Sequence, residues 1–192
     1  MEPIQTVMVC GVAGVGKTTL IRSSLEQWPE TAVYDAHDLA VQAAEVSDST
    51  GLAISAAHRV ARHFQLLARG FSAERSKMER GVIILECHST VDSGAGWFDA
   101  PLHVFKAIAP VALVHVEDEC ERIAKRCLRD RSAVRLTRSV IELARYQDRS
   151  LRACERHAAH LGCSVHRVRA DAADEFRDLI RAIKAGRTPP RE

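Results

Sequence analysis

The stretch that decides the fold is "GVAGVGKT" at residues 11–18, which lies between the apolar run "TVMVC" and the helix-forming segment "TTLIRSSLEQW". It matches the phosphate-binding loop spacing G-x-x-x-x-G-K-[ST] at Gly11, Gly16, Lys17 and Thr18. Glycines allow positive backbone dihedrals, so successive N–H groups can surround a phosphate at the positive end of the following helix. With an apolar run before it and a helix after it, the motif predicts a bound nucleoside triphosphate rather than a chance glycine-rich turn.

We expect the Lys17 ammonium to reach the β and γ phosphates and the Thr18 hydroxyl to ligand Mg²⁺. The predicted cofactors are therefore ATP and Mg²⁺. The residues expected to hold the nucleotide are Gly11, Gly14, Val15, Gly16, Lys17, Thr18 and Thr19. The motif leaves the fate of the γ-phosphate open, because transfer to an acceptor, hydrolysis and regulated switching all begin with the same bound nucleotide.

Short apolar runs alternate with helical patterns through the rest of the chain. The predicted strands are 7–10, 32–34, 82–85, 111–116 and a weaker 164–168, and the predicted helices are 18–28, 38–45, 55–79, 98–108, 119–129, 137–161 and 173–185. Apolar runs without strict alternation suit a parallel sheet covered on both faces. The sequence predicts a three-layer α/β domain, a P-loop NTPase fold with a five-stranded parallel sheet, over residues 1–185, followed by a flexible tail at 186–192.

The composition is that of an ordinary soluble globular domain. The chain has 192 residues, of which 46% are apolar and 27% charged, and its formal net charge is +2. So small a net charge provides no field to recruit nucleic acid or an anionic membrane. The six cysteines form no CxxC pair, and no apolar run reaches membrane-spanning length. We therefore expect a cytoplasmic protein with buried reduced thiols and no membrane or nucleic-acid partner.

An acid and a histidine follow the third predicted strand in "GVIILECHST", residues 81–90. A carboxylate at the end of a strand beside the phosphate loop can hold Mg²⁺ or accept a proton, so Glu86 is a candidate metal ligand and catalytic residue. His88 is a catalytic candidate as well, because side chains two apart on a strand point the same way. The alternatives are that Glu86 only meets solvent and that His88 starts a turn. Asp38 is a similar case, since it either caps the helix that it opens or contacts the acceptor.

Arginines crowd the segment "ERIAKRCLRDRSAVRLTRS" at 121–139. The spacing places three arginines on one helical face, with Ile123, Cys127 and Leu128 expected toward the core. A solvated face is the plain interpretation. The excess of arginine and the expected helix break near 130–133 instead favour a lid over about 129–138 that grips phosphate oxygens. The catalytic candidates in this segment are Arg126, Arg131 and Arg135.

Together these motifs resemble the archaeal-type adenylate kinases over about 7–184, with a weaker similarity to the coilin-interacting, adenylate kinase-like nuclear proteins. The most specific point is "HST" at 88–90, which continues into "VDSGAGWF". There Gly96 and Trp97 fall on a segment that lies near the acceptor nucleotide in the family. The stretch "HDLA" at 37–40 is similar to a Gly-Asp-Leu-Ala segment of the nuclear group. Arg126 and Arg135 fall on lid arginines of the family.

The chain also departs from this family pattern. Lys17 is present although archaeal members often lack it, and Glu86 stands where the family usually has aspartate. A lid arginine of the family falls on Ala133, with Arg131 as a substitute. An arginine-containing acceptor motif has no clear counterpart, although Arg59 or Arg62 can stand in for it. These departures leave the transferase fold in place and put the acceptor in question.

The resemblance implies a kinase that transfers the γ-phosphoryl of ATP to a nucleoside monophosphate, with AMP favoured. It also implies an acceptor-binding segment at about 36–80. The substrate-binding residues implied are Asp38, Arg59, Arg62, His88, Gly96 and Trp97. Two alternatives stay open: an ATPase whose hydrolysis drives assembly of a partner, and a P-loop kinase for another small hydroxylated metabolite. The family includes oligomers, so the oligomeric state is open as well.

Overall fold

The structure is a computed structural model that describes residues 4–25, 28, 30–45, 55–129 and 138–187. Its centre is a five-stranded sheet in the order β2-β3-β1-β6-β7, in which each neighbouring pair is parallel. The strands are β1 (Gln5–Cys10), β2 (Thr31–Asp35), β3 (Val82–Glu86), β6 (Ala112–Glu117) and β7 (Ser164–Arg169). The predicted five-stranded parallel sheet is confirmed.

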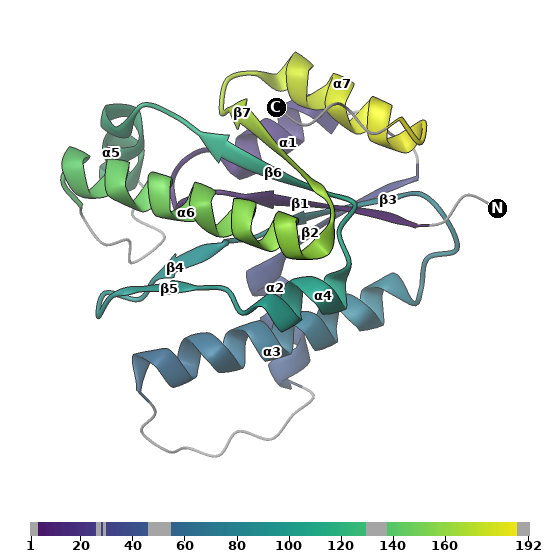
Figure 1. Ribbon diagram of the computed structural model, residues 1–192, viewed down its shortest axis with the longest axis horizontal. Helices are drawn as coiled ribbons and strands as arrows, with labels where there is room; N and C mark the ends of the chain where they lie inside the picture. The colour runs from purple at the N-terminus through teal and green to yellow at the C-terminus, as the bar shows by residue number, and fades with distance from the viewer. Residues whose placement is uncertain (1–3, 26–27, 29, 46–54, 130–137, 188–192) are drawn as a thin grey trace.

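Helices cover both faces of this sheet (Figure 1). They are α1 (Lys17–Leu25), α2 (Ala36–Glu45), α3 (Ala56–Arg75), α4 (Leu102–Ile108), α5 (Cys120–Arg129), α6 (Val140–Leu161) and α7 (Ala173–Lys184). Alternate side chains of β1 enter different cores: Val7 and Val9 pack with α1 and α7, whereas Met8 packs with α2, α3, α4 and the second half of α6. The three-layer architecture follows from β1 being apolar on both faces.

The predicted helix at 98–108 is wrong in its first part. Residues Trp97–Asp99 form a short strand, β5, which pairs antiparallel with β4 (Thr90–Asp92), and α4 begins only after Pro101. The hairpin is held by Tyr146 of α6, whose hydroxyl donates to the Thr90 carbonyl oxygen at 2.9 Å and whose ring stacks on Trp97 at 5.4 Å. These contacts come from a helix distant in sequence, so local periodicity could not indicate them.

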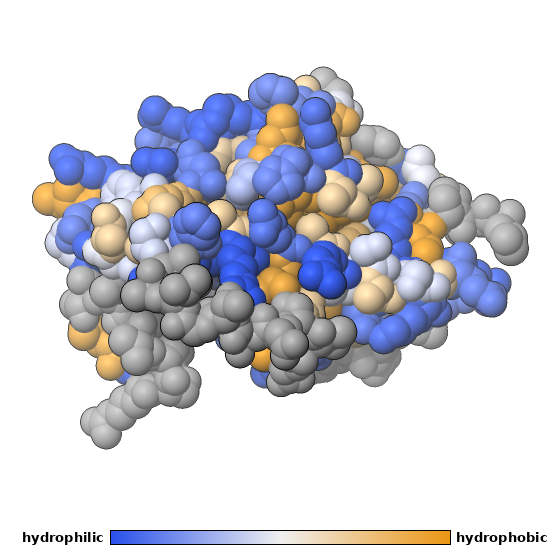
Figure 2. Space-filling view, turned by 90° about the horizontal axis from the view of Figure 1, so that it is seen from below, coloured by the Kyte–Doolittle hydropathy of each residue, from blue (hydrophilic) through white to orange (hydrophobic). Residues whose placement is uncertain are grey.

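The prediction that Leu128 faces the core is wrong. Leu128, predicted to face the core, is 67% exposed at the end of α5, whereas Ile123 of the same helix is fully buried. On the face seen from below in Figure 1, hydrophilic and hydrophobic residues are interspersed among the described side chains (Figure 2). No helix within the described residues is long and apolar enough to cross a bilayer.

Three predicted segments are not settled by the structure. The lid at 129–138 and the tail at 186–192 fall mostly outside the described residues. The acceptor-binding segment at 36–80 corresponds to α2 and α3 with an undescribed stretch between them. All three stay predictions.

Candidate active site

The loop between β1 and α1 has the backbone shape that its glycines predict. Gly11 and Gly16 have φ values of 152° and 110°, in the region that favours glycine. A Cβ at Gly11 would lie 2.8 Å from the carbonyl oxygen of Val116, so the neighbouring strand leaves no room for a side chain there. The loop therefore passes close to the carboxyl end of β6, and it ends at Lys17, the first residue of α1.

Lys17 is folded over this loop. Its ammonium donates to the carbonyl oxygens of Gly11 at 3.1 Å and Val12 at 3.2 Å, and the residue is only 5% exposed. Burial lowers the pKa of Lys17, and the negative charge of Glu86 is the largest effect opposing that shift. The structure thus places a buried cation at the N-terminus of α1, near the Glu86 carboxylate at the end of β3.

Thr18 and Glu86 meet directly. The Thr18 hydroxyl donates to Glu86 Oε1 at 2.8 Å, because β3 lies next to β1 and ends at the same edge of the sheet. Burial raises the pKa of Glu86, although Lys17 and the Thr18 hydrogen bond act in the opposite direction. Two oxygen-bearing side chains side by side are the donors that Mg²⁺ prefers.

The donor set fits a magnesium ion that also takes ligands from a nucleotide. Within the part of the chain that the structure describes, no group of three or more His, Cys, Asp or Glu side chains could hold a metal alone. Mg²⁺ in kinase sites is typically bound by one or two carboxylates together with substrate phosphates and water. Thr18 and Glu86 therefore fit the predicted metal site in identity and position.

His88 follows Glu86 by two residues and lines the same cavity. Its Nδ1 is 2.8 Å from the Gly11 carbonyl oxygen, which also accepts from Lys17. A carbonyl oxygen only accepts hydrogen bonds, so Nδ1 carries a proton. His88 and Glu86 both line one cavity with Lys17, and their roles there stay predictions.

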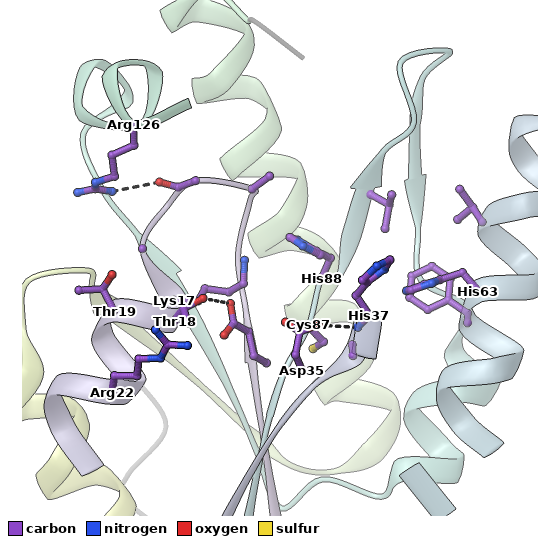
Figure 3. Close-up of a pocket in the computed structure, with 18 of the residues that line it drawn as sticks. Lys17, Thr18, Thr19, Arg22, Asp35, His37, His63, Cys87, His88 and Arg126 are labelled. Atoms are coloured by element: carbon purple, nitrogen blue, oxygen red, sulfur yellow. Dashed lines mark hydrogen bonds between the residues drawn. The ribbon is translucent and has the colours of Figure 1, made fainter. Parts of the chain in front are cut away.

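Arg126 of α5 contacts the phosphate loop from the opposite side. Its Nη1 donates to the carbonyl oxygens of Gly14 at 3.2 Å and Val15 at 2.6 Å, and its Nη2 pairs with the buried Asp118 carboxylate. Figure 3 shows Arg126 above the loop. This predicted arginine is thus at the donor site, anchored by Asp118.

Four further arginines of the arginine-rich segment at 121–139 fall into two groups. Arg131 and Arg135 lie outside the described residues and stay predictions. Arg122 pairs with Asp171 at 3.1 Å, and Arg138 pairs with Asp92 of the hairpin at 2.9 Å. These two ion pairs join α5 to the segment after β7 and the start of α6 to the β4–β5 hairpin.

The cavity extends from the loop toward α2 and α3 and has a volume of about 830 Å³. Its far side includes Asp35, which ends β2, and His37 and His63 (Figure 3). Arg59 of α3 lines the cavity as well. Asp35 Oδ1 accepts the backbone N–H groups of His37 at 2.7 Å and Asp38 at 3.3 Å. The helix therefore begins at Ala36 with Asp35 as its capping side chain, and the interpretation of Asp38 as the cap is wrong.

Two imidazoles and several apolar side chains complete this far side. The rings of His37 and His63 stack with centroids 5.9 Å apart and an interplanar angle of 25°. Burial lowers the pKa of His63, and the neighbouring His37 lowers it further. Val60, Phe64 and Val91 line the same space, which gives it both polar and apolar walls.

The predicted acceptor residues are only partly brought together. Arg59 lines the cavity with His88, whereas Arg62 and the exposed Asp38 are not among its lining residues. Gly96 and Trp97 sit on the β4–β5 hairpin, also outside that lining. Their roles stay predictions.

Sequence reasoning missed Arg22, Asp35, His37 and His63. A signal existed for Asp35, since it follows an apolar strand as Glu86 does, and the carboxyl ends of parallel strands meet at one edge. His37 follows Asp35 by two residues and shares that signal. His63 and Arg22 had none, because each looks like one more polar residue on a helix.

A family model described as an AAA domain matches residues 10–143. The chain belongs to this family. It is also 29% identical over 172 residues to an adenylate kinase of Methanoculleus marisnigri, which covers 85% of this chain and 88% of that relative. These two findings support the adenylate kinase-like assignment, and we describe the chain as an adenylate kinase-like P-loop kinase.

Solved structures agree on the fold of this adenylate kinase-like protein. The tunicamycin resistance protein of Deinococcus radiodurans matches with a TM-score of 0.59 and 14% identity, covering 99% of this chain and 100% of that one. A shikimate kinase from Bacteroides thetaiotaomicron matches with a TM-score of 0.50 and 15% identity, covering 92% and 98%. At such identities the two structures show the shared fold alone. The similarity to the nuclear coilin-interacting group stays a prediction.

Proposed function

We propose that this protein transfers the γ-phosphoryl group of ATP to a nucleoside monophosphate, with AMP the favoured acceptor. The observation that carries the proposal is that one cavity is lined by the phosphate loop, by the Thr18–Glu86 pair and by Arg59. An arginine in the wall of the cavity that also contains the donor loop suits an acceptor that is itself a phosphate. The similarity to an adenylate kinase over most of both chains supports AMP as the acceptor.

The donor half has defined roles in this proposal. The loop N–H groups and Lys17 bind the β and γ phosphates, and the contact of Arg126 with the loop keeps its shape. Thr18 and Glu86 hold Mg²⁺, which neutralises charge on the phosphates when it is bound. Arg131 and Arg135, which lie outside the described residues, are proposed to neutralise charge on the transferring group.

The acceptor half needs only to bind and orient. An oxygen of the acceptor phosphate attacks the γ-phosphorus, the bond from that phosphorus to the β–γ bridging oxygen breaks, and ADP leaves. Arg59 binds the acceptor phosphate, and His88 orients it beside the loop. No proton has to be removed from the attacking oxygen, because a phosphate monoester is mostly dianionic near neutral pH.

A coupled assay of ADP release tests this proposal. With Mg²⁺-ATP and each nucleoside monophosphate in turn, we expect AMP to raise the rate most. The proposal is falsified if every monophosphate leaves the rate at the background without acceptor. High acceptor-independent turnover that rises when a partner is added would instead support the ATPase alternative.

A further inference from the structure

Asp35 is a cavity carboxylate for which the transfer to a monophosphate has no use. It ends β2, and its Cα is the register partner of Glu86 at the end of β3. It lies close enough to Lys17 and Glu86 for its charge to raise the pKa of both. Asp35 therefore sits beside the reacting centre, on the side of the cavity formed by α2 and α3.

The carboxylate is held in one orientation. Both N–H groups that bind it, from His37 and Asp38, use the Oδ1 oxygen. Oδ2 takes part in neither bond, and Asp35 lines the cavity. A carboxylate that lines the cavity and is fixed to a helix through only one of its oxygens has the form of a proton acceptor.

The chemistry of the two acceptor classes differs at this point. A phosphate acceptor brings negative charge and no proton to lose, so a carboxylate beside it is unfavourable. A hydroxyl acceptor is uncharged and must lose its proton as the new P–O bond forms. Asp35 suits the second class, whereas Arg59 suits the first, and both line the same cavity.

We propose that the site also phosphorylates a hydroxyl group, with Asp35 as the proton acceptor. The hydroxyl oxygen bonds to the γ-phosphorus, its proton passes to the Asp35 carboxylate, and the bond from that phosphorus to the β–γ bridging oxygen breaks. The products are a phosphate monoester and ADP. This activity uses the donor half of the proposed function and goes beyond it on the acceptor side.

The walls of the cavity indicate a hydroxylated molecule of nucleoside size with a flat apolar part. Val60, Phe64 and Val91 offer apolar surface, and the stacked His37 and His63 rings offer a planar one. A small polyol would leave this surface exposed to water. A nucleoside presents a hydroxyl group at one end and an aromatic base at the other, so adenosine and uridine are the probes.

The test compares adenosine with AMP, which differ only by the phosphate. ADP release and phosphorus NMR of the product are measured for the wild-type protein and for Asp35→Asn. Asparagine retains a side-chain oxygen that can cap α2 but carries no charge, so the variant is expected to fold, and ATP binding checks this.

We expect wild-type turnover of at least one of adenosine and uridine, and a loss of about 100-fold or more on that nucleoside in the variant. The loss on AMP should be less than about tenfold, because no proton transfer is removed. Asp178→Asn, which removes an exposed charge on α7, is the matched control.

The outcomes separate this inference from the proposed function. Absence of nucleoside turnover in the wild type, or equal losses on nucleoside and AMP in Asp35→Asn, overturns the inference. Nucleoside turnover that depends on Asp35, with no turnover of any monophosphate, supports the inference and overturns the monophosphate proposal. Turnover of AMP alone supports the proposed function and overturns the inference.

Discussion

The two halves of the cavity are built in different ways. The donor half is built around one continuous segment, the phosphate loop, whose backbone carbonyl oxygens accept hydrogen bonds from Lys17 at the start of α1 and from Arg126 of α5. The proposed acceptor half is assembled from the end of β2, from α2, from α3 and from the residues after β3, and side chains such as Asp35 and Arg59 line it. Backbone contacts make the first half independent of most substitutions, whereas the second half can change its substrate with single residues. Substitutions in the donor half and in the acceptor half can therefore test whether ATP use and acceptor binding change independently.

The largest effect is expected from Lys17→Ala in the donor half. Its buried ammonium is the cation nearest the transferring group in our proposal, and alanine leaves nothing in its place. Turnover at saturating ATP should fall about 1000-fold with every acceptor, whether phosphate or hydroxyl. Lys106→Ala on the exposed side of α4 is the control. An unchanged rate would remove Lys17 from the mechanism, and a loss confined to one acceptor would break the separation of the halves.

Glu86→Gln tests the junction of the two halves. Glutamine can still accept the Thr18 hydrogen bond, but it lacks the charge that holds a divalent cation. We expect turnover to fall about 100-fold, with partial recovery at high Mg²⁺ concentration. A titration of rate against Mg²⁺ measures this, with Glu121→Gln as an exposed control. A Mg²⁺ dependence identical to that of the wild type would exclude Glu86 as a metal ligand.

Arg59→Ala tests the acceptor half alone. The side chain lines the cavity opposite the loop, and a charge-assisted contact to a phosphate is lost on truncation. The KM for AMP should rise about tenfold while the KM for ATP stays within about twofold of the wild-type value. Steady-state kinetics with each substrate varied in turn provides both constants, and Arg69→Ala on the exposed surface of α3 serves as the control. An equal rise in both constants would argue that α3 supports the whole site structurally.

The same division explains what could be predicted from the sequence. The phosphate loop is local: residues 11–18 specify its glycine dihedrals, its lysine and its flanking elements, and Lys17 and Thr18 begin α1 directly after the loop, as the spacing predicts. Their contacts with phosphate and Mg²⁺ stay predictions. The centre of the sheet was predictable as well, because β1, β3 and β6 are short, largely apolar runs that are almost entirely buried.

The acceptor half could be predicted only in part, because its residues come together through packing. His63 reaches the cavity because Phe64, Leu67 and Phe71 turn the other face of α3 into the core. Asp35 lies beside Glu86 because β2 pairs with β3 in a register that aligns the two acids, and that register is set by packing of the two strands. The hairpin at 90–99 depends on Tyr146, which lies about fifty residues later and gives no local signal.

The smallest effect concerns stability and follows from the raised pKa of Glu86. Burial favours the protonated form in the folded protein and outweighs the attraction of Lys17, so the folded pKa lies above the unfolded one. Such a group contributes stability that is fully present below the unfolded pKa and is lost as the pH rises through the folded pKa. Ionised Glu86 therefore lowers the stability of the folded protein at neutral and alkaline pH, where the proposed function requires its charge.

Without nucleotide, Glu86→Gln should raise Tm at pH 8 by about 1 to 3 °C, and the difference should vanish toward pH 4. Thermal unfolding at both pH values, with Glu79→Gln as an exposed control, measures the effect. A lower Tm for the variant at pH 8 would mean that the attraction between Glu86 and Lys17 exceeds the cost of burying the carboxylate.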